Sequence, residues 1–184
     1  QGTKLVISPV AGISKIAETG AAVDLSADGN TLIVGSPSSL DTVLNQTGLI
    51  TVFTRTAGTW TQGPSTWSTT NLVSISQPVN SQGSRVSISA DGTVIAESGD
   101  GAVVMYSYLG GILTQVQFLE TSNFGNKFGL GGLDLSADGL NLAVGATGQS
   151  PNGVVYIYVN VAGIWTLQGL PVQTSNLLSN LALF

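Results

Sequence analysis

The chain has 184 residues, of which 42% are hydrophobic and only 8% are charged, and its formal net charge is −5. Its five cations are scattered, which argues against nucleic acid as a partner, because phosphate binding needs clustered lysine and arginine. The absence of cysteine and histidine excludes disulfides, thiolate catalysis and the usual zinc ligands. No apolar run approaches the length that a transmembrane helix needs.

The chain opens on a β-prone run at residues 3–10, which is expected to form an outer strand without a sheet of its own. Pro9 near its end suits an edge or a strand terminus, since proline has no N–H for a ladder. Residues 11–19 are expected to form a loop or a short strand.

From Val23 onward the sequence alternates, with Val23 and Leu25 on one face and Asp24 on the other. A period of two predicts a strand with one buried face. The dipeptide Asp28-Gly29 then predicts a tight hairpin turn of the primed type, in which both central residues have positive φ.

This strand–turn–strand pattern occurs three times, which makes repetition the main feature of the chain. The copies lie at residues 20–35, 86–96 and 133–145. A glycine opens a third strand in each copy, and a second glycine precedes a fourth. From Gly48, Gly101 and Gly153 to the fourth-strand residues Trp60, Leu113 and Trp165 the separation is constant, whereas the loop before each strand-opening glycine varies in length.

Fixed strands joined by one variable loop predict a single all-β repeat domain over residues 1–184. Its parts are a lead-in outer strand and loop (3–19), three four-stranded antiparallel blades (20–71, 72–123 and 124–176) and the start of a further strand (177–184). Four strands per repeat favour a β-propeller-like array over a solenoid, whose coils are shorter. Three blades predict an incomplete ring, or part of a larger or oligomeric propeller.

The third copy resembles the FG-GAP repeat of integrin-α-type β-propellers. The residues that carry the resemblance are Lys127-Phe128-Gly129, Leu133 to Gly139, Ala143-Val144-Gly145-Ala146, Gly153 to Tyr158 and Gly163-Ile164-Trp165. The resemblance covers about residues 20–176. The second copy departs from it, with Glu97-Ser98-Gly99 in place of the Gly-Ala-Pro motif and no Phe-Gly ahead of Val86.

The resemblance also implies a calcium loop, for which the candidate ligands are Asp24, Ser26, Asp28, Asp134, Ser136 and Asp138. The final acid of that loop is missing, because Leu32 and Leu142 stand in its place. Calcium takes 6–8 oxygen ligands, and two carboxylates with one hydroxyl fall far short. We therefore expect no cofactor, and we expect the acids to be outward polar residues that flank the turns.

An enzymatic function is not expected. General acid–base catalysis needs histidine or paired carboxylates at a cleft, and no Gly-x-Ser-x-Gly elbow occurs. The glycine cluster at 129–132 precedes a strand and has no lysine at the spacing of a phosphate-binding loop.

Three tryptophans are candidate ligand residues, since planar partners stack on exposed indoles. Trp60 and Trp165 share a repeat position, where blade packing is the competing interpretation, and Trp67 lies outside the repeat. Asn45-Gln46-Thr47 in loop 36–47 is an acceptor sequence for N-glycosylation in a secreted protein.

The sequence therefore predicts a non-enzymatic structural or protein-interaction module of a secreted, cell-surface or virus-particle assembly. Its expected partners are other protein subunits, through self-association or a larger assembly, because open propeller faces are apolar. The alternative is a carbohydrate-binding lectin or adhesin that uses pockets between blades or loop 36–47. Neither nucleic acid binding nor membrane insertion is expected.

Overall fold

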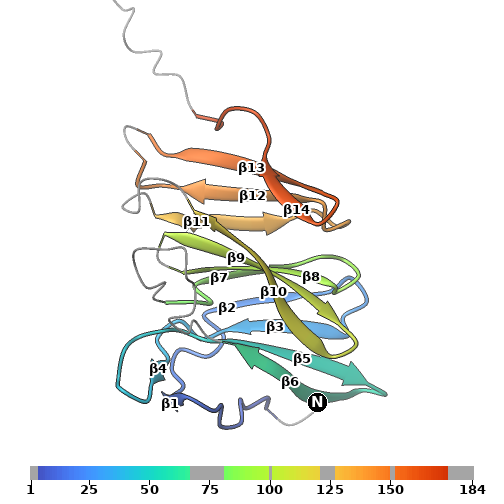
Figure 1. The fold of residues 1–184 in the computed structure, drawn as a ribbon. Helices are drawn as coiled ribbons and strands as arrows, with labels where there is room; N and C mark the ends of the chain where they lie inside the picture. The colour runs from blue at the N-terminus through green and yellow to red at the C-terminus, as the bar shows by residue number, and fades with distance from the viewer. Residues whose placement is uncertain (1–3, 67–80, 100, 121–126, 150–151, 174–184) are drawn as a thin grey trace, which may run out of the picture.

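The computed structural model describes residues 4–66, 81–99, 101–120, 127–149 and 152–173. It is all-β, with three four-stranded antiparallel sheets stacked one upon another, which confirms the predicted fold class (Figure 1). Among the described residues no helix is long and apolar enough to cross a membrane. Trp67 and residues 177–184 lie outside the described residues.

Each sheet takes its four strands in the order of the sequence, in pairs that run antiparallel. The first sheet contains β2 (Ala22–Leu25), β3 (Thr31–Gly35), β5 (Ile50–Thr56) and β6 (Thr59–Thr66). The second contains β7 (Arg85–Ile88), β8 (Val94–Gly99), β9 (Ala102–Leu109) and β10 (Ile112–Glu120). The third contains β11 (Phe128–Leu135), β12 (Asn141–Ala146), β13 (Val154–Val161) and β14 (Ile164–Leu167).

The pairing of the strands defines which residues of the three sheets occupy equivalent positions. In the three sheets Asp24 pairs with Ile33, Ser87 with Ala96 and Asp134 with Ala143, so these residues occupy one repeat position. The same registers align Val23 with Val86 and Leu133, and Leu25 with Ile88 and Leu135. Equivalent residues can therefore be compared directly among the three sheets.

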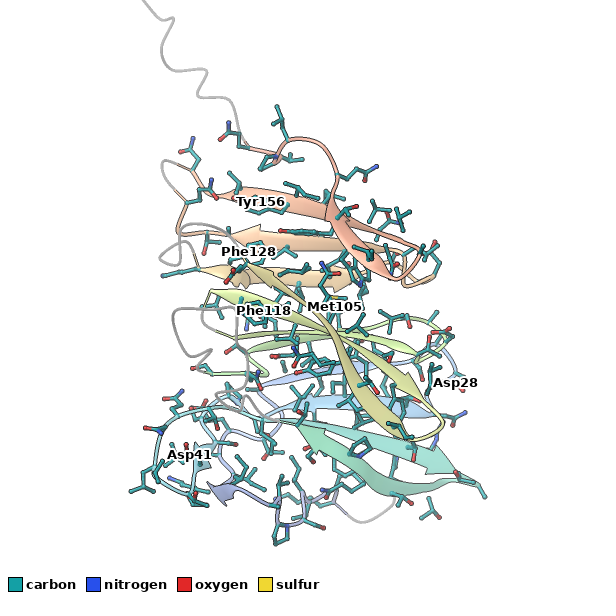
Figure 2. All side chains as sticks on the ribbon, viewed as in Figure 1. Asp28, Asp41, Met105, Phe118, Phe128 and Tyr156 are labelled. Carbon is teal, nitrogen blue, oxygen red and sulfur yellow. The ribbon has the colours of Figure 1, made fainter. Side chains whose placement is uncertain are left out.

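Two apolar layers lie between the sheets, and β9 contributes to both through its alternation. Val104, Tyr106 and Tyr108 belong to the layer against the first sheet, whereas Val103 and Met105 belong to the layer against the third. Figure 2 shows Met105 and Phe128 in the region where the second and third sheets meet. A strand that is buried on both faces needs a nearly continuous apolar run, which explains the sequence of β9.

The lead-in differs from its prediction. The strand expected at residues 3–10 is wrong for residues 4–10, which form no strand. Instead β1 (Ile13–Lys15) pairs with β4 (Leu40–Asp41) of loop 36–47. Near Pro9, which lacks an N–H for a ladder, the Ser8 N–H donates to the side-chain oxygen of Gln62 at 2.6 Å. The lead-in is thus attached to the first sheet partly through side chains.

The exposure of β2 also differs from its prediction. Val23 and Leu25, expected on a buried face, are 59% and 50% exposed. The face that carries Asp24 is the one that packs against the second sheet, with Ala22 against its apolar layer. The alternation identified the strand correctly but not its buried face, because the second sheet packs against the face that carries Ala22 and Asp24.

Candidate functional site

The Ser-Ala-Asp-Gly turns join the first two strands of each sheet and are wider than predicted. In the first turn, the Ser26 N–H donates to the Thr31 carbonyl at 2.9 Å, and the Gly29 N–H donates to the Ser26 carbonyl at 2.8 Å. Of the pair Asp28-Gly29 only Gly29 has a positive φ, at 65°. The predicted primed two-residue turn is therefore wrong, and four residues lie between the hydrogen-bonded pair Ser26 and Thr31 instead.

Serine and aspartate side chains stabilise this wider turn. The Ser26 hydroxyl donates to Asp28 Oδ1 at 2.6 Å and accepts the Thr31 N–H at 3.0 Å, while Asp28 Oδ1 accepts the Asn30 N–H at 2.9 Å. The Ser26 hydrogen bond, followed by those from Asn30, holds the pKa of Asp28 below its ordinary value. The same serine-to-aspartate bond recurs at 2.6 Å in Ser89–Asp91 and at 2.5 Å in Ser136–Asp138.

The three turns are also bonded to one another. The Ala27 N–H donates to the Ala90 carbonyl and the Ala90 N–H donates to the Ala137 carbonyl, both at 2.9 Å. The turn glycines fit closely at the same contacts, and a Cβ on Gly139 would lie 3.0 Å from the Val94 side chain. A backbone ladder therefore links the sheets in one direction, from the first to the third.

A second link uses the side chain at the middle of each first strand. Asp24 Oδ2 accepts the Ile88 N–H at 2.9 Å, and the Ser87 hydroxyl accepts the Leu135 N–H at 3.0 Å. Asp134 is the third residue of this set; it is exposed and accepts no hydrogen bond from the described part of the chain. At this position Asp24 and Ser87 therefore each bond to the backbone of the next sheet.

These arrangements do not fit the calcium site that the family resemblance implies. Asp24 is directed at a backbone N–H of the second sheet, whereas Asp28 is saturated by donors within its own turn. Asp138 likewise accepts from the Ser136 hydroxyl and the Leu140 N–H. No group of three acidic residues that could hold a metal ion occurs among the described residues. Hydrogen-bond donors thus already occupy the carboxylates of Asp24, Asp28 and Asp138, which calcium would need as ligands, and leave only that of Asp134 without a bond among the described residues.

Glu97 is a buried acid that the sequence analysis treated only as a departure from a motif. One of its oxygens accepts the Gly83 N–H at 2.9 Å, and the other has no partner, as is also true of the Gln82 side-chain oxygen. Burial raises the pKa of Glu97 to about 8, so its carboxyl group is protonated at neutral pH. Burial, followed by the nearby Glu97 charge, also raises the pKa of Tyr106. The position of Glu97 within an apolar strand is the feature of the sequence that could have indicated its burial.

In the second sheet the counterpart of Phe128-Gly129 is Gln82-Gly83, which the Phe-Gly motif does not identify. Both glycines have a φ of 80°, and the residues before each pair, Ser81 and Lys127, have positive φ as well. Gly83 lies three residues before Val86, as Gly20 lies three before Val23, so the spacing of glycines contained the signal. The equivalence was not evident from the sequence because Gln82 stands where the third copy has the aromatic residue Phe128.

The candidate tryptophans are placed differently. Trp165 is 4% exposed between the second and third sheets, where Gln117 donates to its carbonyl at 2.9 Å and accepts its N–H at 2.8 Å. Trp60 occupies the same position in the first sheet, is half-buried and stacks under the Arg55 guanidinium at 5.4 Å. Trp165 is thus a packing residue, whereas no sheet formed by the described residues covers Trp60.

Loop 36–47 is held by hydrogen bonds at the end of the first sheet opposite Asp28 (Figure 2). Asp41 accepts the N–H groups of Val43 and Asn45, and the Asn45 side-chain amide donates to its other oxygen at 3.0 Å. Some desolvation opposes these hydrogen bonds, which nevertheless keep the pKa of Asp41 below its ordinary value. Asn45 is exposed, and its amide already has a partner.

The two ends of the stack are unlike its middle. On the outer face of the third sheet Val155 is 39% exposed and Ile157 is half-buried. Their counterparts in the second sheet, Val103 and Met105, are fully buried because the third sheet covers them. The outer face of the third sheet is therefore more exposed than the equivalent apolar face of the second sheet.

A scan against protein-family models finds no match, and a search of curated proteins finds none either. Solved β-propeller structures are similar at the level of the fold. A structure described as a putative 6-phosphogluconolactonase from Bacteroides uniformis ATCC 8492 matches with a TM-score of 0.52 and 16% identity, over 80% of this chain and 38% of that one.

A second match is KlAtg21 in its complex with the coiled coil of AgAtg16, with a TM-score of 0.51 and 16% identity. It covers 77% of this chain and 40% of that one. This chain therefore spans about two fifths of the length of the propellers it matches. At this identity the similarity describes the architecture alone, because one fold of this kind carries many functions.

Proposed function

We propose that the chain is a non-enzymatic structural or protein-interaction module that acts through the faces of its terminal sheets. One observation carries the proposal. Within the part of the chain that the structure describes, no further sheet covers the face of the third sheet that the first and second sheets each bury against their neighbour. Val155 and Ile157 lie on this face, and their counterparts in the first and second sheets are completely buried.

The family assignment belongs to the same proposal. We place the repeats with the FG-GAP repeats of integrin-α-type propellers, with sites that are not of the calcium-binding form. The support is positional, because Gln82-Gly83 stands where Phe128-Gly129 stands and Thr19-Gly20 precedes β2 in the same way. A propeller needs 4–8 blades to close, so a chain with three sheets acts together with other sheets.

The chemistry of the surface supports a structural role. The acids of the Ser-Ala-Asp-Gly turns are occupied by hydrogen bonds, and Glu97, which is completely buried, is away from solvent. With charged residues at 8% of the chain, the exterior depends on uncharged polar groups. We place such a surface in a secreted, cell-surface or virus-particle assembly, with protein subunits as partners.

The test is the state of association of the intact chain. Light scattering coupled to size exclusion, run from sub-micromolar to several hundred micromolar protein, is expected to show a mass that rises above the monomer as concentration increases. The result should hold in high salt, because an apolar interface is not screened. A monomer at every concentration would contradict the proposal.

A further inference from the structure

We propose that the outer face of the third sheet binds the first sheet of a second copy of this chain, head to tail. In this contact Asp134 accepts the N–H of the second copy's Leu25, and the Ala137 N–H donates to the carbonyl of the second copy's Ala27. The inference rests on the proposed function and specifies its partner and its register.

The template for this contact occurs twice within the chain. At both internal interfaces, a polar side chain in a first strand accepts an N–H from the next sheet, and a turn alanine donates to the next turn. The acceptors are Asp24 and Ser87, and the donors are Ala27 and Ala90. The scheme has a direction, so each sheet has one face that supplies these groups and another that receives them.

The third sheet carries the groups that supply these contacts at the internal interfaces, but within the described residues they contact no further sheet. Asp134 is exposed, and among the described residues neither its carboxylate nor the Ala137 N–H has a hydrogen-bond partner. Beside them lies Val155 at 39% exposure, whereas Ile50 and Val103 at the same repeat position are fully buried. The face thus combines the acceptor, the donor and the apolar contact that both internal interfaces use.

The first sheet carries the groups that would receive these contacts, and no sheet formed by the described residues lies against them. Val23 and Leu25 are 59% and 50% exposed, whereas Val86 and Ile88, their counterparts in the second sheet, are 9% and 6% exposed. The Leu25 N–H turns back to its own neighbour, Asp24 Oδ1, at 2.8 Å. In the second and third sheets the equivalent N–H groups bond to the preceding sheet.

The glycines agree with this assignment. A Cβ on Gly83 would lie 2.8 Å from Gly35 Cα of the preceding sheet, and one on Gly129 would lie 2.6 Å from Ser98 Cβ. Gly20, the equivalent residue of the first sheet, has a φ of 89° and open space around it. Its backbone therefore has the shape for a close approach that nothing within the described chain makes.

The edge of the interface has a matching pair as well. Gln117 bonds to the backbone of Trp165 across the second internal interface. Gln168 stands beside Ile157, to whose carbonyl its N–H donates, as Gln117 stands beside Met105. Gln168 of one copy and Trp60 of the other are thus the corresponding pair.

A second copy is the occupant that these observations favour, because both halves of one interface are present on the same chain. The lead-in contacts loop 36–47 and β6, through Ser14 with Asp41 and Ser8 with Gln62, and leaves β2 exposed. Two copies supply six sheets, within the range in which propellers close. The interface is heterologous, since each copy contributes a different face.

The test is a complementation between two variants. Val155→Asp removes the supplying face and Val23→Asp removes the receiving face; both positions are exposed in the single chain, so circular dichroism should show folded protein. Leu109→Asp, at a position that is 61% exposed in the middle sheet, is the matched control. Analytical ultracentrifugation should give a dimer for the wild type and the control, and a dissociation constant raised more than about tenfold for each of the other variants.

An equimolar mixture of Val155→Asp and Val23→Asp should restore a dimer, since one intact face of each variant can still meet. If either variant dimerises like the wild type, or the mixture stays monomeric, the head-to-tail contact is wrong. Wild-type assembly that survives Val155→Asp overturns this contact alone. A wild type that is monomeric throughout overturns the proposed function together with it.

Discussion

The two internal interfaces share a backbone scheme but differ in what fills them. Between the first and second sheets the linking side chain is a carboxylate, Asp24, and the interface encloses Glu97 with an unpaired oxygen. Between the second and third sheets the link is the Ser87 hydroxyl, and an aromatic cluster fills the layer. In that cluster Phe128 meets Tyr156 edge to face, with ring centroids 5.4 Å apart.

This difference shows that the relative placement of two sheets and the stability of their interface have different causes. Hydrogen bonds between the turns are the same at both interfaces, so they fix how one sheet is placed on the next. The free energy of packing comes from apolar burial, which the aromatic cluster supplies and the buried carboxyl group diminishes. We therefore expect the interface of the second and third sheets to be the more stable one.

The largest effect is expected at Phe128, which is fully buried between the second and third sheets. Phe128→Ala should lower the free energy of unfolding by about 3–5 kcal/mol, through lost burial and the cavity left behind. Urea unfolding monitored by fluorescence measures it. At the same position of the other interface, Gln82→Met should change the stability by less than about 1 kcal/mol, because it removes an oxygen that has no partner. Equal losses would contradict the comparison.

Next in size is a pH dependence at the first interface. Because burial raises the pKa of Glu97 from 4.5 to about 8, the folded chain holds a proton that the unfolded chain releases. This contribution to stability is complete below pH 4.5 and is lost as the pH rises towards 8, with a slope of about 1.4 kcal/mol per pH unit. The free energy of unfolding of the wild type and of Glu97→Gln, measured across this pH range, tests the effect. If the two proteins show the same dependence on pH, Glu97 is not its source.

A smaller effect compares an internal contact with a free end. Gly83→Ala places a Cβ against the Leu49 carbonyl at 2.7 Å and keeps a φ of 80°, so it should cost at least about 2 kcal/mol. Gly20→Ala has a φ of 89° but open space, and should cost only about 1 kcal/mol. Thermal unfolding of the monomer distinguishes them. If Gly20→Ala proves the costlier, the close approach at Gly83 is not what constrains it.

The smallest effect tests the turns. Ser89 is fully buried, donates to Asp91 and accepts the Val94 N–H. Ser89→Ala should cost about 1–2 kcal/mol, since it leaves a buried N–H without its acceptor. Ser38→Ala, in loop 36–47, removes an exposed bond to Glu18 and serves as the control, with a change of less than about 0.5 kcal/mol. Chemical denaturation resolves both.

Much of the architecture could be predicted from the sequence because it depends on patterns among residues that are close together in the chain. The alternation at 20–35, the constant spacing from Gly48 to Trp60 and its copies, and the glycine turns predict three four-stranded units, and the structure has them. Local patterns could not reveal that Glu97 is enclosed or that Gln82-Gly83 replaces Phe128-Gly129. Both depend on which face of one sheet meets the next.

The sequence by itself determined the repeat, the strands and the absence of histidine and cysteine. Only the tertiary structure decided which faces are buried. Val23 and Val86 have the same local pattern, yet one is 59% exposed and the other 9%. The physical reason is that burial in a stack of sheets depends on the neighbouring sheet, which lies far away in the sequence. The second sheet has such a neighbour on each face, whereas within the described residues each end sheet has one on a single face.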